Sequence, residues 1–154
     1  DRYGMKQPKW ITDIEFVREW GEGYWVRRTW SEQALVQTTS VIDTVSDKEI
    51  YTVNDVHYVP IGGIAYSGAK GISAVEIQVD DGEWMLAQLK TPLSDTTWVQ
   101  WRFDWAFTPG DHTFRVRAKD RGSKAQIESN APVRPDGATG IHSRRASLET
   151  PSGA

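Results

Sequence analysis

The sequence predicts an all-β fold, a two-sheet β-sandwich of the immunoglobulin-like kind, on two observations. In the stretch 62–120, apolar and polar residues alternate at the period of a half-buried strand. The chain also offers about eight short strand candidates, separated by turn signals, in little over a hundred residues. No stretch has a helical period. Because the chain contains no cysteine, apolar burial alone has to hold the two sheets together.

The most regular strands predict the core. Over 75–79, apolar residues take the odd positions and polar residues the even ones. The same alternation recurs over 99–107 and over 114–118. Because Trp98 precedes an inward-facing residue, it has to point to the opposite face. We expect the apolar members of these strands to be buried, namely Val75, Ile77, Val79, Trp101, Phe103, Phe114 and Val116.

Turn signals divide these strands from one another. Asp81-Gly82 predicts a tight hairpin, because glycine tolerates a positive φ, and a return strand is expected over 84–89. Pro109-Gly110 ends the strand that begins near Trp98.

Flanking segments give weaker signals. A strand over 56–65 contains Pro60, which predicts an edge position or a bulge, and Gly62-Gly63 fits an irregularity at the same place. Residues 46–54 are polar and predict a turn. Further short strands are expected at 10–17, 34–42, 125–127 and 141–148.

Composition limits the partners. At 154 residues, the chain is one domain or one domain with a short attachment. A net charge of −3 gives no case for nucleic acid or an anionic membrane as partner. No apolar run approaches the roughly 20 residues that span a bilayer, so no membrane contact is expected of this segment. The first residue is Asp1 rather than Met, and we expect a piece of a longer protein, whose compartment stays open.

Eight tryptophans exceed what one sandwich core can enclose. Some of them are therefore expected at a surface that something else covers. Two explanations stay open. One is a broad apolar face that pairs with a second copy about a two-fold axis. The other is a free-standing module that binds carbohydrate or peptide through two or three coplanar exposed rings.

Patterns of catalytic and metal-binding residues are missing from the sequence. The three histidines are far apart, and none has a second ligand at a metal-binding spacing. There is no phosphate-binding glycine loop and no nucleophile elbow. The acidic residues between Asp43 and Asp55 lack the alternate spacing of a calcium loop. We expect no catalysis and no bound metal from this chain alone.

A series of short segments carries a family resemblance. They are 3–6 (YGMK), 9–11 (KWI), 23–25 (GYW), 63–68 (GIAYSG), 71–72 (GI), 75–84 (VEIQVDDGEW), 101–102 (WR), 117–120 (RAKD) and 135–142 (PDGATGIH). In this order they resemble the C-terminal dimerisation domain of the sulfite oxidase family of molybdopterin-dependent oxidoreductases, in its bacterial form.

The resemblance implies three parts and two partners. Residues 1–30 would end the molybdopterin-binding domain and form the joint, 31–147 would be the immunoglobulin-like dimerisation domain, and 148–154 a frayed tail. The partners would be the upstream molybdopterin domain and a second copy, giving a homodimer. The molybdenum–molybdopterin cofactor would belong to the parent enzyme, an exported or membrane-anchored bacterial protein. This chain lacks the cysteine that binds the metal, so it would hold no cofactor itself.

The resemblance also suggests site residues. Lys9 matches a lysine that helps to hold the pterin phosphate, although a solvated lysine explains it equally well. Trp30 stands where the animal enzymes have a tyrosine that faces the substrate. Asp136 stands where animal and plant enzymes have an anion-binding arginine, and this exchange reverses the charge offered to an oxyanion. Sulfite is therefore not expected as the parent's substrate. Trp98 is the candidate residue for the dimer interface.

Overall fold

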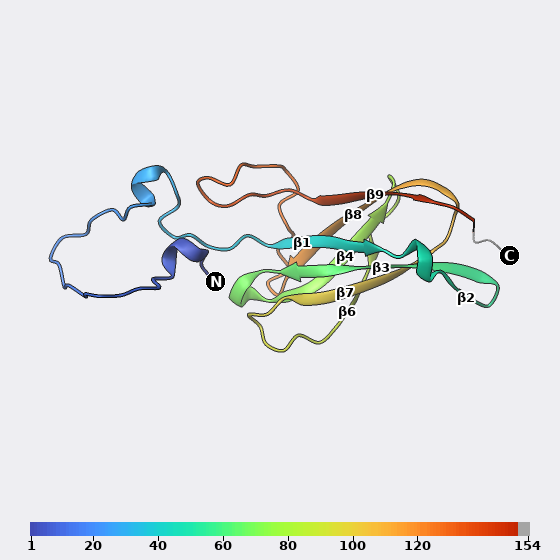
Figure 1. Cartoon of the computed structure of the whole chain (residues 1–154), viewed down its shortest axis with the longest axis horizontal. Coiled ribbons are helices and arrows are strands. Elements are labelled where there is room, and N and C mark those ends of the chain that lie inside the picture. Colours follow the sequence, from blue (N-terminus) through green and yellow to red (C-terminus); the bar gives the residue numbers. More distant parts are fainter. Residues whose placement is uncertain (151–154) are drawn as a thin grey trace.

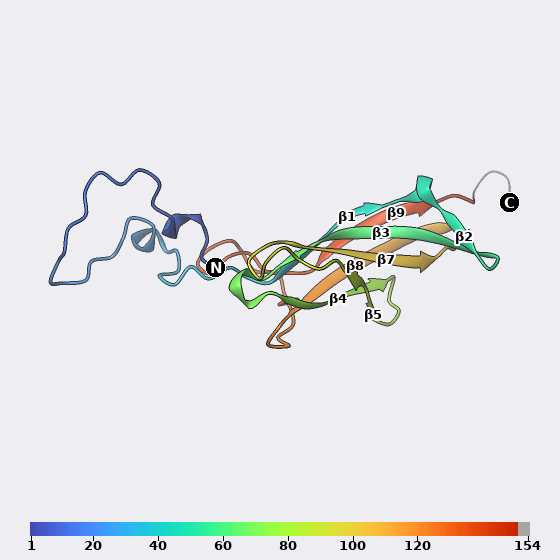
Figure 2. The same ribbon diagram turned by 90° about the horizontal axis from the view of Figure 1, so that it is seen from below.

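The computed structural model describes residues 1–150 and is an immunoglobulin-like β-sandwich, with two antiparallel sheets packed face to face (Figures 1 and 2). The frayed tail expected at the C-terminus falls largely on residues 151–154, which lie outside that range. The first sheet has the order β1-β3-β7-β6, with β2 beside β3, and the second has the order β5-β4-β8-β9. The strands are β1 (Thr39–Val45), β2 (Tyr51–Val53), β3 (Val56–Tyr66), β4 (Ile72–Val79), β5 (Met85–Leu86), β6 (Gln88–Leu89), β7 (Val99–Ala106), β8 (Gly110–Asp120) and β9 (His142–Leu148).

Short 3-10 turns complete the fold. They are η1 (Gly4–Lys6), η2 (Val26–Arg28), η3 (Asp47–Glu49) and η4 (Gly68–Lys70). The first two belong to the N-terminal arm, residues 1–30, which extends beyond one end of the sandwich. Strand β9 leads to the opposite end (Figure 1).

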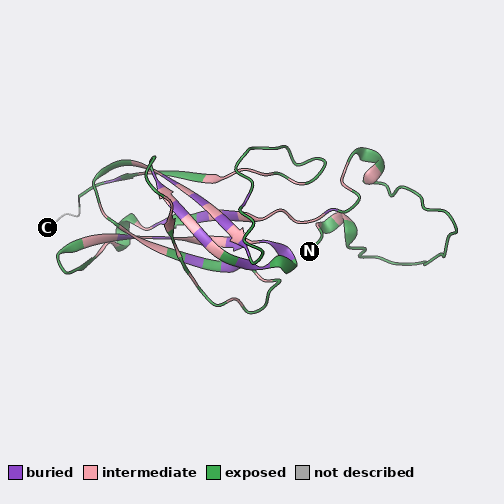
Figure 3. Ribbon diagram, turned by 180° about the vertical axis from the view of Figure 1, so that it is seen from behind, coloured by how far each residue is buried: buried purple, intermediate pink, exposed green. Residues whose placement is uncertain are grey.

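The predicted core is confirmed with one difference. Six of the seven expected residues are buried between the sheets, and buried positions alternate with half-buried ones along much of β4 and β8 (Figure 3). Phe103 is only half-buried. The short strand β6 pairs with Trp101 and Arg102 and goes no further, so the rest of β7 forms the edge of its sheet. Phe103 and the later side chains of β7 therefore have no neighbouring strand on one side.

Gly63 allows a close approach in the core. It pairs with Trp101 on β7, and the indole of Trp101 lies over it. A Cβ atom at Gly63 would lie 2.7 Å from Cζ2 of Trp101 and would overlap the carbonyl oxygen of Val41. Only glycine therefore lets β1 and this indole pack against the same point of β3.

Pro60 lies on an interior strand rather than at the predicted edge, at a position that is unpaired on one side. Its carbonyl accepts a hydrogen bond from the Ser46 N–H at 2.8 Å, on the side where β1 has ended and β2 has not begun. The missing proline N–H faces the same side, so no sheet hydrogen bond is lost. The predicted irregularity also exists, because the β1–β3 register shifts between Ile42 and Thr44, opposite Gly62-Gly63.

The predicted hairpin at Asp81-Gly82 joins β4 to β5, but it is not a tight one. The residue with positive φ is Asp80, at 53°, and a longer loop joins β4 to β5. The Asp80 carboxylate accepts a hydrogen bond from the Thr113 N–H at 2.8 Å and lies 2.9 Å from Nδ1 of His112. Aspartate tolerates the left-handed region better than most residues, and these contacts hold it there.

The expected return strand over 84–89 is divided between the sheets. β5 pairs with β4 in the second sheet, whereas β6 pairs with β7 in the first. The Ala87 N–H between them donates to the Val75 carbonyl at 2.9 Å, which keeps the crossing segment attached to β4.

Three further strand predictions differ from the structure. The first strand is 39–45 rather than 34–42, and 125–127 forms only an isolated bridge to Lys119. Residues 10–17 form no strand, because they lie in the arm beyond the end of the sandwich, where no other strand of the described chain reaches them (Figure 1). The predicted turn at 46–54 contains η3 and the short strand β2.

Candidate functional site

An apolar pocket of about 530 Å³ lies where the N-terminal arm meets the loop between β8 and β9. Tyr3 and Trp30 have ring centroids 5.8 Å apart with planes tilted by 56°, and Trp25 and Trp30 are 6.5 Å apart at 78°. These rings enclose a corner and do not form the coplanar platform expected of a carbohydrate-binding module. The lining residues are Tyr3, Gly4, Met5, Trp25, Trp30, Val133 and Gly137.

Hydrogen bonds to backbone carbonyls hold the two walls of this pocket together. The Pro135 carbonyl accepts one hydrogen bond from the Ser31 N–H and another from the Tyr3 hydroxyl, each at 2.9 Å. Gln37 Nε2 donates to the Asp136 carbonyl at 2.8 Å. The structure therefore brings Trp30, which lines the pocket, close to the loop that carries Asp136.

The family resemblance suggested three residues near the cofactor and the substrate funnel, and the structure does not bring all three to one place. Trp30 lines the pocket, and Asp136 is exposed and directly precedes the lining residue Gly137. Lys9 is exposed on the arm and is not among the described residues that line the pocket. No Lys, Arg, Asp or Glu occurs among those lining residues, so the described walls carry no charged side chain.

Gln126 anchors the loop that contributes to the pocket. Its side chain is 4% exposed; its Oε1 accepts hydrogen bonds from the Ser40 hydroxyl at 2.7 Å and the Ala118 N–H at 3.2 Å. Its Nε2 donates to the Gly140 carbonyl at 2.7 Å. One side chain thus joins β1, β8 and the end of the 127–141 loop. These hydrogen bonds fix the position of the loop's end.

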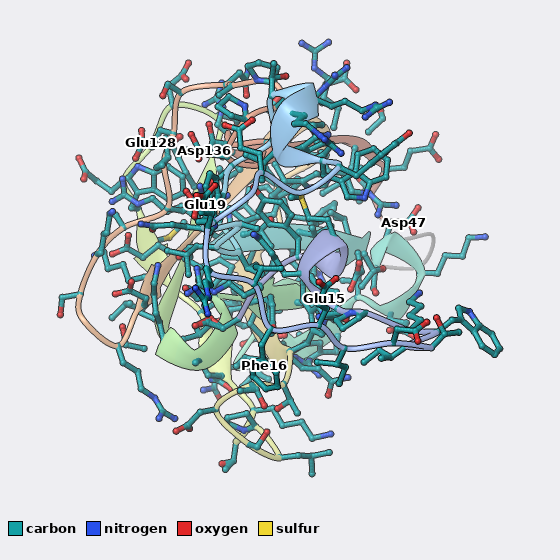
Figure 4. All side chains as sticks on the ribbon, turned by 90° about the vertical axis from the view of Figure 1, so that its left-hand side faces the viewer. Glu15, Phe16, Glu19, Asp47, Glu128 and Asp136 are labelled. Atoms are coloured by element: carbon teal, nitrogen blue, oxygen red, sulfur yellow. The ribbon has the colours of Figure 1, made fainter. Side chains whose placement is uncertain are left out.

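The arm exposes a dense set of apolar side chains. Phe16 is 98% exposed, and in the view from the arm end it lies in front of the sandwich (Figure 4). Exposed apolar surfaces of this kind mark protein or membrane contacts, ligand grooves or aggregation-prone sites. The exposed apolar residues of the arm are Trp10, Ile11, Ile14, Phe16, Val17, Trp20, Tyr24 and Trp25.

The outer face of the first sheet carries aromatic residues at both ends. Trp98 is 48% exposed and stacks on Tyr66, with centroids 4.9 Å apart, which confirms that it points away from the core. Tyr51 stacks on Tyr58 at the other end, at 5.7 Å. Arg102 Nε donates to Asp104 at 2.9 Å, and this bond raises the pKa of the guanidinium.

The outer face of the second sheet is instead covered by ion pairs. Glu76 accepts hydrogen bonds from Arg117 at 2.7 Å and from Lys119 at 2.6 Å. Partial burial raises the pKa of Glu76, but the hydrogen bonds from Lys119 and Arg117 outweigh it, so the pKa is lowered overall. Arg117 also pairs with Glu128 at 2.6 Å and lies over the Trp84 ring. The charges on this outer face are therefore largely neutralised within one copy.

The described residues offer neither a metal site nor a membrane span. They contain no group of three or more His, Cys, Asp or Glu side chains placed to hold a metal ion. His112 is held by Asp80 and packs edge-on against Trp105 at 4.7 Å, which is a structural role. Within residues 1–150, no helix has the length and apolar character needed to cross a bilayer.

Sequence reasoning missed three residues of these surfaces. Gln126 gave no signal, because a glutamine between alanine and isoleucine resembles any polar position of a strand. Gly62 was noted only as an irregularity, although it leaves the outer face of β3 hollow. Leu93 lies in a polar loop after Pro92, and only the structure shows its side chain to be 97% exposed.

Comparisons with known proteins identify a family and a protein of similar fold. The model of the Mo-co oxidoreductase dimerisation domain matches residues 30–132. Among solved structures, the crystal structure of the sulfane dehydrogenase SoxCD from Paracoccus pantotrophus matches with a TM-score of 0.55 and 20% identity. The match covers 74% of this chain and 33% of that chain, so this chain spans about a third of that protein's length. No curated protein matches.

Proposed function

The chain belongs to the Mo-co oxidoreductase dimerisation domain family, and on that premise we propose that it pairs two subunits through the outer face of its first sheet. The observation that carries this proposal is the stacked pair of Trp98 and Tyr66, a large aromatic surface that the chain leaves exposed on that face. Aromatic residues are enriched at the centres of protein interfaces.

The second sheet is the weaker choice for a pairing face. Charged residues are depleted from interface cores, and the Glu76–Arg117–Lys119 cluster would have to lose water when covered. The first sheet requires less desolvation at its centre, because the outward positions on β3 include the uncharged Pro60, Gly62 and Ile64.

We assign residues 1–30 to the contact with an upstream molybdopterin-binding domain. Two observations support this. The arm forms no sheet within the described chain, yet it exposes eight large apolar residues. The related SoxCD chain is about three times as long as the matched part, which leaves room for a further domain.

Trp30 and Asp136 are proposed to border the active-site funnel of the parent enzyme. Their support is their position: Trp30 lines the pocket, whose described walls carry no cation, and the exposed Asp136 directly precedes the lining residue Gly137. An oxyanion such as sulfite would find no positive partner among these residues, so the proposed substrate is a different one.

The residues of this chain do not fit a molybdenum centre. The sequence has no cysteine, and the described residues hold no cluster of metal-ligating side chains. The cofactor is therefore assigned to the parent's upstream domain, and no chemical step is assigned to this chain. Lys9 is proposed only as a cation that could meet the pterin phosphate, since its side chain is exposed on the arm.

Replacing Trp98 with glutamate is expected to weaken dimerisation at least about tenfold, because a charge would replace an aromatic anchor of the proposed contact. Sedimentation equilibrium measures the dissociation constant, and circular dichroism checks that the sandwich still folds. Trp98 is half exposed, so the monomer has little reason to unfold.

The matched control is Trp20→Glu, which makes the same change at a residue of the arm that is 66% exposed. It should leave the dissociation constant unchanged. If Trp20→Glu abolished association and Trp98→Glu did not, the arm rather than the sheet would be the self-associating surface.

A further inference from the structure

The outer face of the first sheet has a hollow whose floor is a glycine. The hollow measures about 480 Å³ and lies over Gly62, with Asp43, Thr44, Gln100 and Arg102 among its walls. It exists because the neighbouring outward positions of β3 are filled by Pro60 and Ile64, whereas Gly62 has no side chain.

One copy of the chain does not itself require glycine at position 62. A Cβ atom there would meet the Trp101 carbonyl at 3.5 Å and Thr44 Cγ2 at 3.7 Å, which are ordinary contacts. Its backbone also lies outside the left-handed region that favours glycine. Gly63 differs, since a Cβ atom there would collide with the Trp101 ring. The hollow is therefore not explained by packing within the monomer.

A protruding leucine lies on the same face. Leu93 belongs to the loop between β6 and β7 and is 97% exposed. The loop has a defined shape, because Thr97 Oγ1 donates to the Ser94 carbonyl at 2.8 Å and accepts from the Ser94 N–H at 3.2 Å. Lys90 N–H donates to the Gln100 carbonyl at 2.9 Å, which ties the loop to β7. Leu93 is thus presented from a fixed base.

The leucine and the glycine hollow are parts of one continuous surface. A second hollow of about 390 Å³ lies between this loop and the sheet, and Leu93 and Trp98 are among its walls. The two hollows share Ile64, Lys90 and Gln100. A two-fold interface uses the same patch on both copies, so a patch that carries both a projection and a matching recess can pair with itself.

We propose that Leu93 of each copy inserts into the hollow over Gly62 of its partner. The inference rests on the proposed function, because it takes a second copy as the occupant and continues the surface already assigned to Trp98. Charge favours the same occupant: the hollow is lined by both Asp43 and Lys90, so a second copy can bring the Lys90 of one copy to the Asp43 of the other. Each hollow is incomplete without the other copy's leucine.

A disulfide trap tests the contact directly, because the chain has no cysteine to interfere. The double variant Leu93→Cys/Thr44→Cys is expected to form a covalent dimer under mild oxidation at least about tenfold faster than either single variant. The control pair is Leu86→Cys/Thr44→Cys, in which the exposed Leu86 lies on β5 of the other sheet. A trap no faster than this control pair would overturn the proposal.

A second variant tests the recess without adding a cysteine. Gly62→Leu should fill the hollow while leaving the monomer folded, and should raise the dimer dissociation constant at least about tenfold. If Gly62→Leu dimerised like the wild type while Trp98→Glu did not, the dimer would stand and the Leu93 insertion would be wrong. A monomeric wild type would instead refute the proposed pairing, and this inference with it.

Discussion

Replacing Phe114 with alanine is expected to lower the free energy of unfolding by about 3–5 kcal/mol, the usual cost of removing a buried phenylalanine. Phe114 is fully buried at the centre of β8 and packs edge-on against Trp105, with ring centroids 5.5 Å apart. Alanine would leave a cavity between the two sheets, and no disulfide would limit the loss. Denaturation by urea measures the change.

The arm supplies a matched control for this experiment. Phe16→Ala makes the same substitution at a residue that is 98% exposed, and it should change the free energy of unfolding by less than about 0.5 kcal/mol. Both variants have to be compared at one protein concentration, because dimerisation adds to apparent stability. Equal losses at the two positions would contradict the assignment of the core.

Replacing Gln126 with leucine is expected to cost about 3 kcal/mol or more, although the two side chains have similar size. The change removes three hydrogen bonds and leaves the Ala118 N–H and the Gly140 carbonyl without their partner. Each buried group left unsatisfied costs about 1–3 kcal/mol. The urea midpoint should fall, with little change in the slope of the transition.

Gln37→Leu is the control for Gln126. Its side chain also donates to a loop carbonyl, that of Asp136, but at an exposed site where water can replace it. Its expected cost is below about 1 kcal/mol. A Gln126→Leu variant as stable as Gln37→Leu would show that the buried network does not hold the loop.

The alternating strands could be predicted because their pattern has one physical cause. Where one face of a strand is buried, a shift of one residue would turn every apolar side chain to water, so Val75, Ile77 and Val79 determine their own register. Phe103 follows the same rule but is half-buried, because β6 ends before reaching it. The pattern shows which side faces inward but does not show where the neighbouring strand stops.

Other parts depend on contacts that a local pattern does not contain. The apolar residues of 10–17 resemble those of a strand, but a strand needs a partner, and these residues pair with no strand of the described chain. The segment 84–89 resembles one strand, yet its halves serve different sheets. The turn after β4 depends on Asp80 reaching Thr113, a residue distant in the sequence.

The candidate surfaces were foreseen only in part. The outward direction of Trp98 followed from its place beside Val99, and the structure confirms it. The link between Trp30 and the Asp136 loop depends on the Pro135 carbonyl, which has no side-chain signal in the sequence. The same holds for Gln126, whose partners come from three separate segments.

The molecular mass of the unmodified chain in solution, measured by sedimentation equilibrium over a range of concentrations, tests the central claim most directly. Pairing through the first sheet predicts a reversible dimer of twice the 17.4 kDa of one chain, and no species larger than this dimer. A single species of 17.4 kDa at the highest concentration, or a continuous series of aggregates, would contradict it.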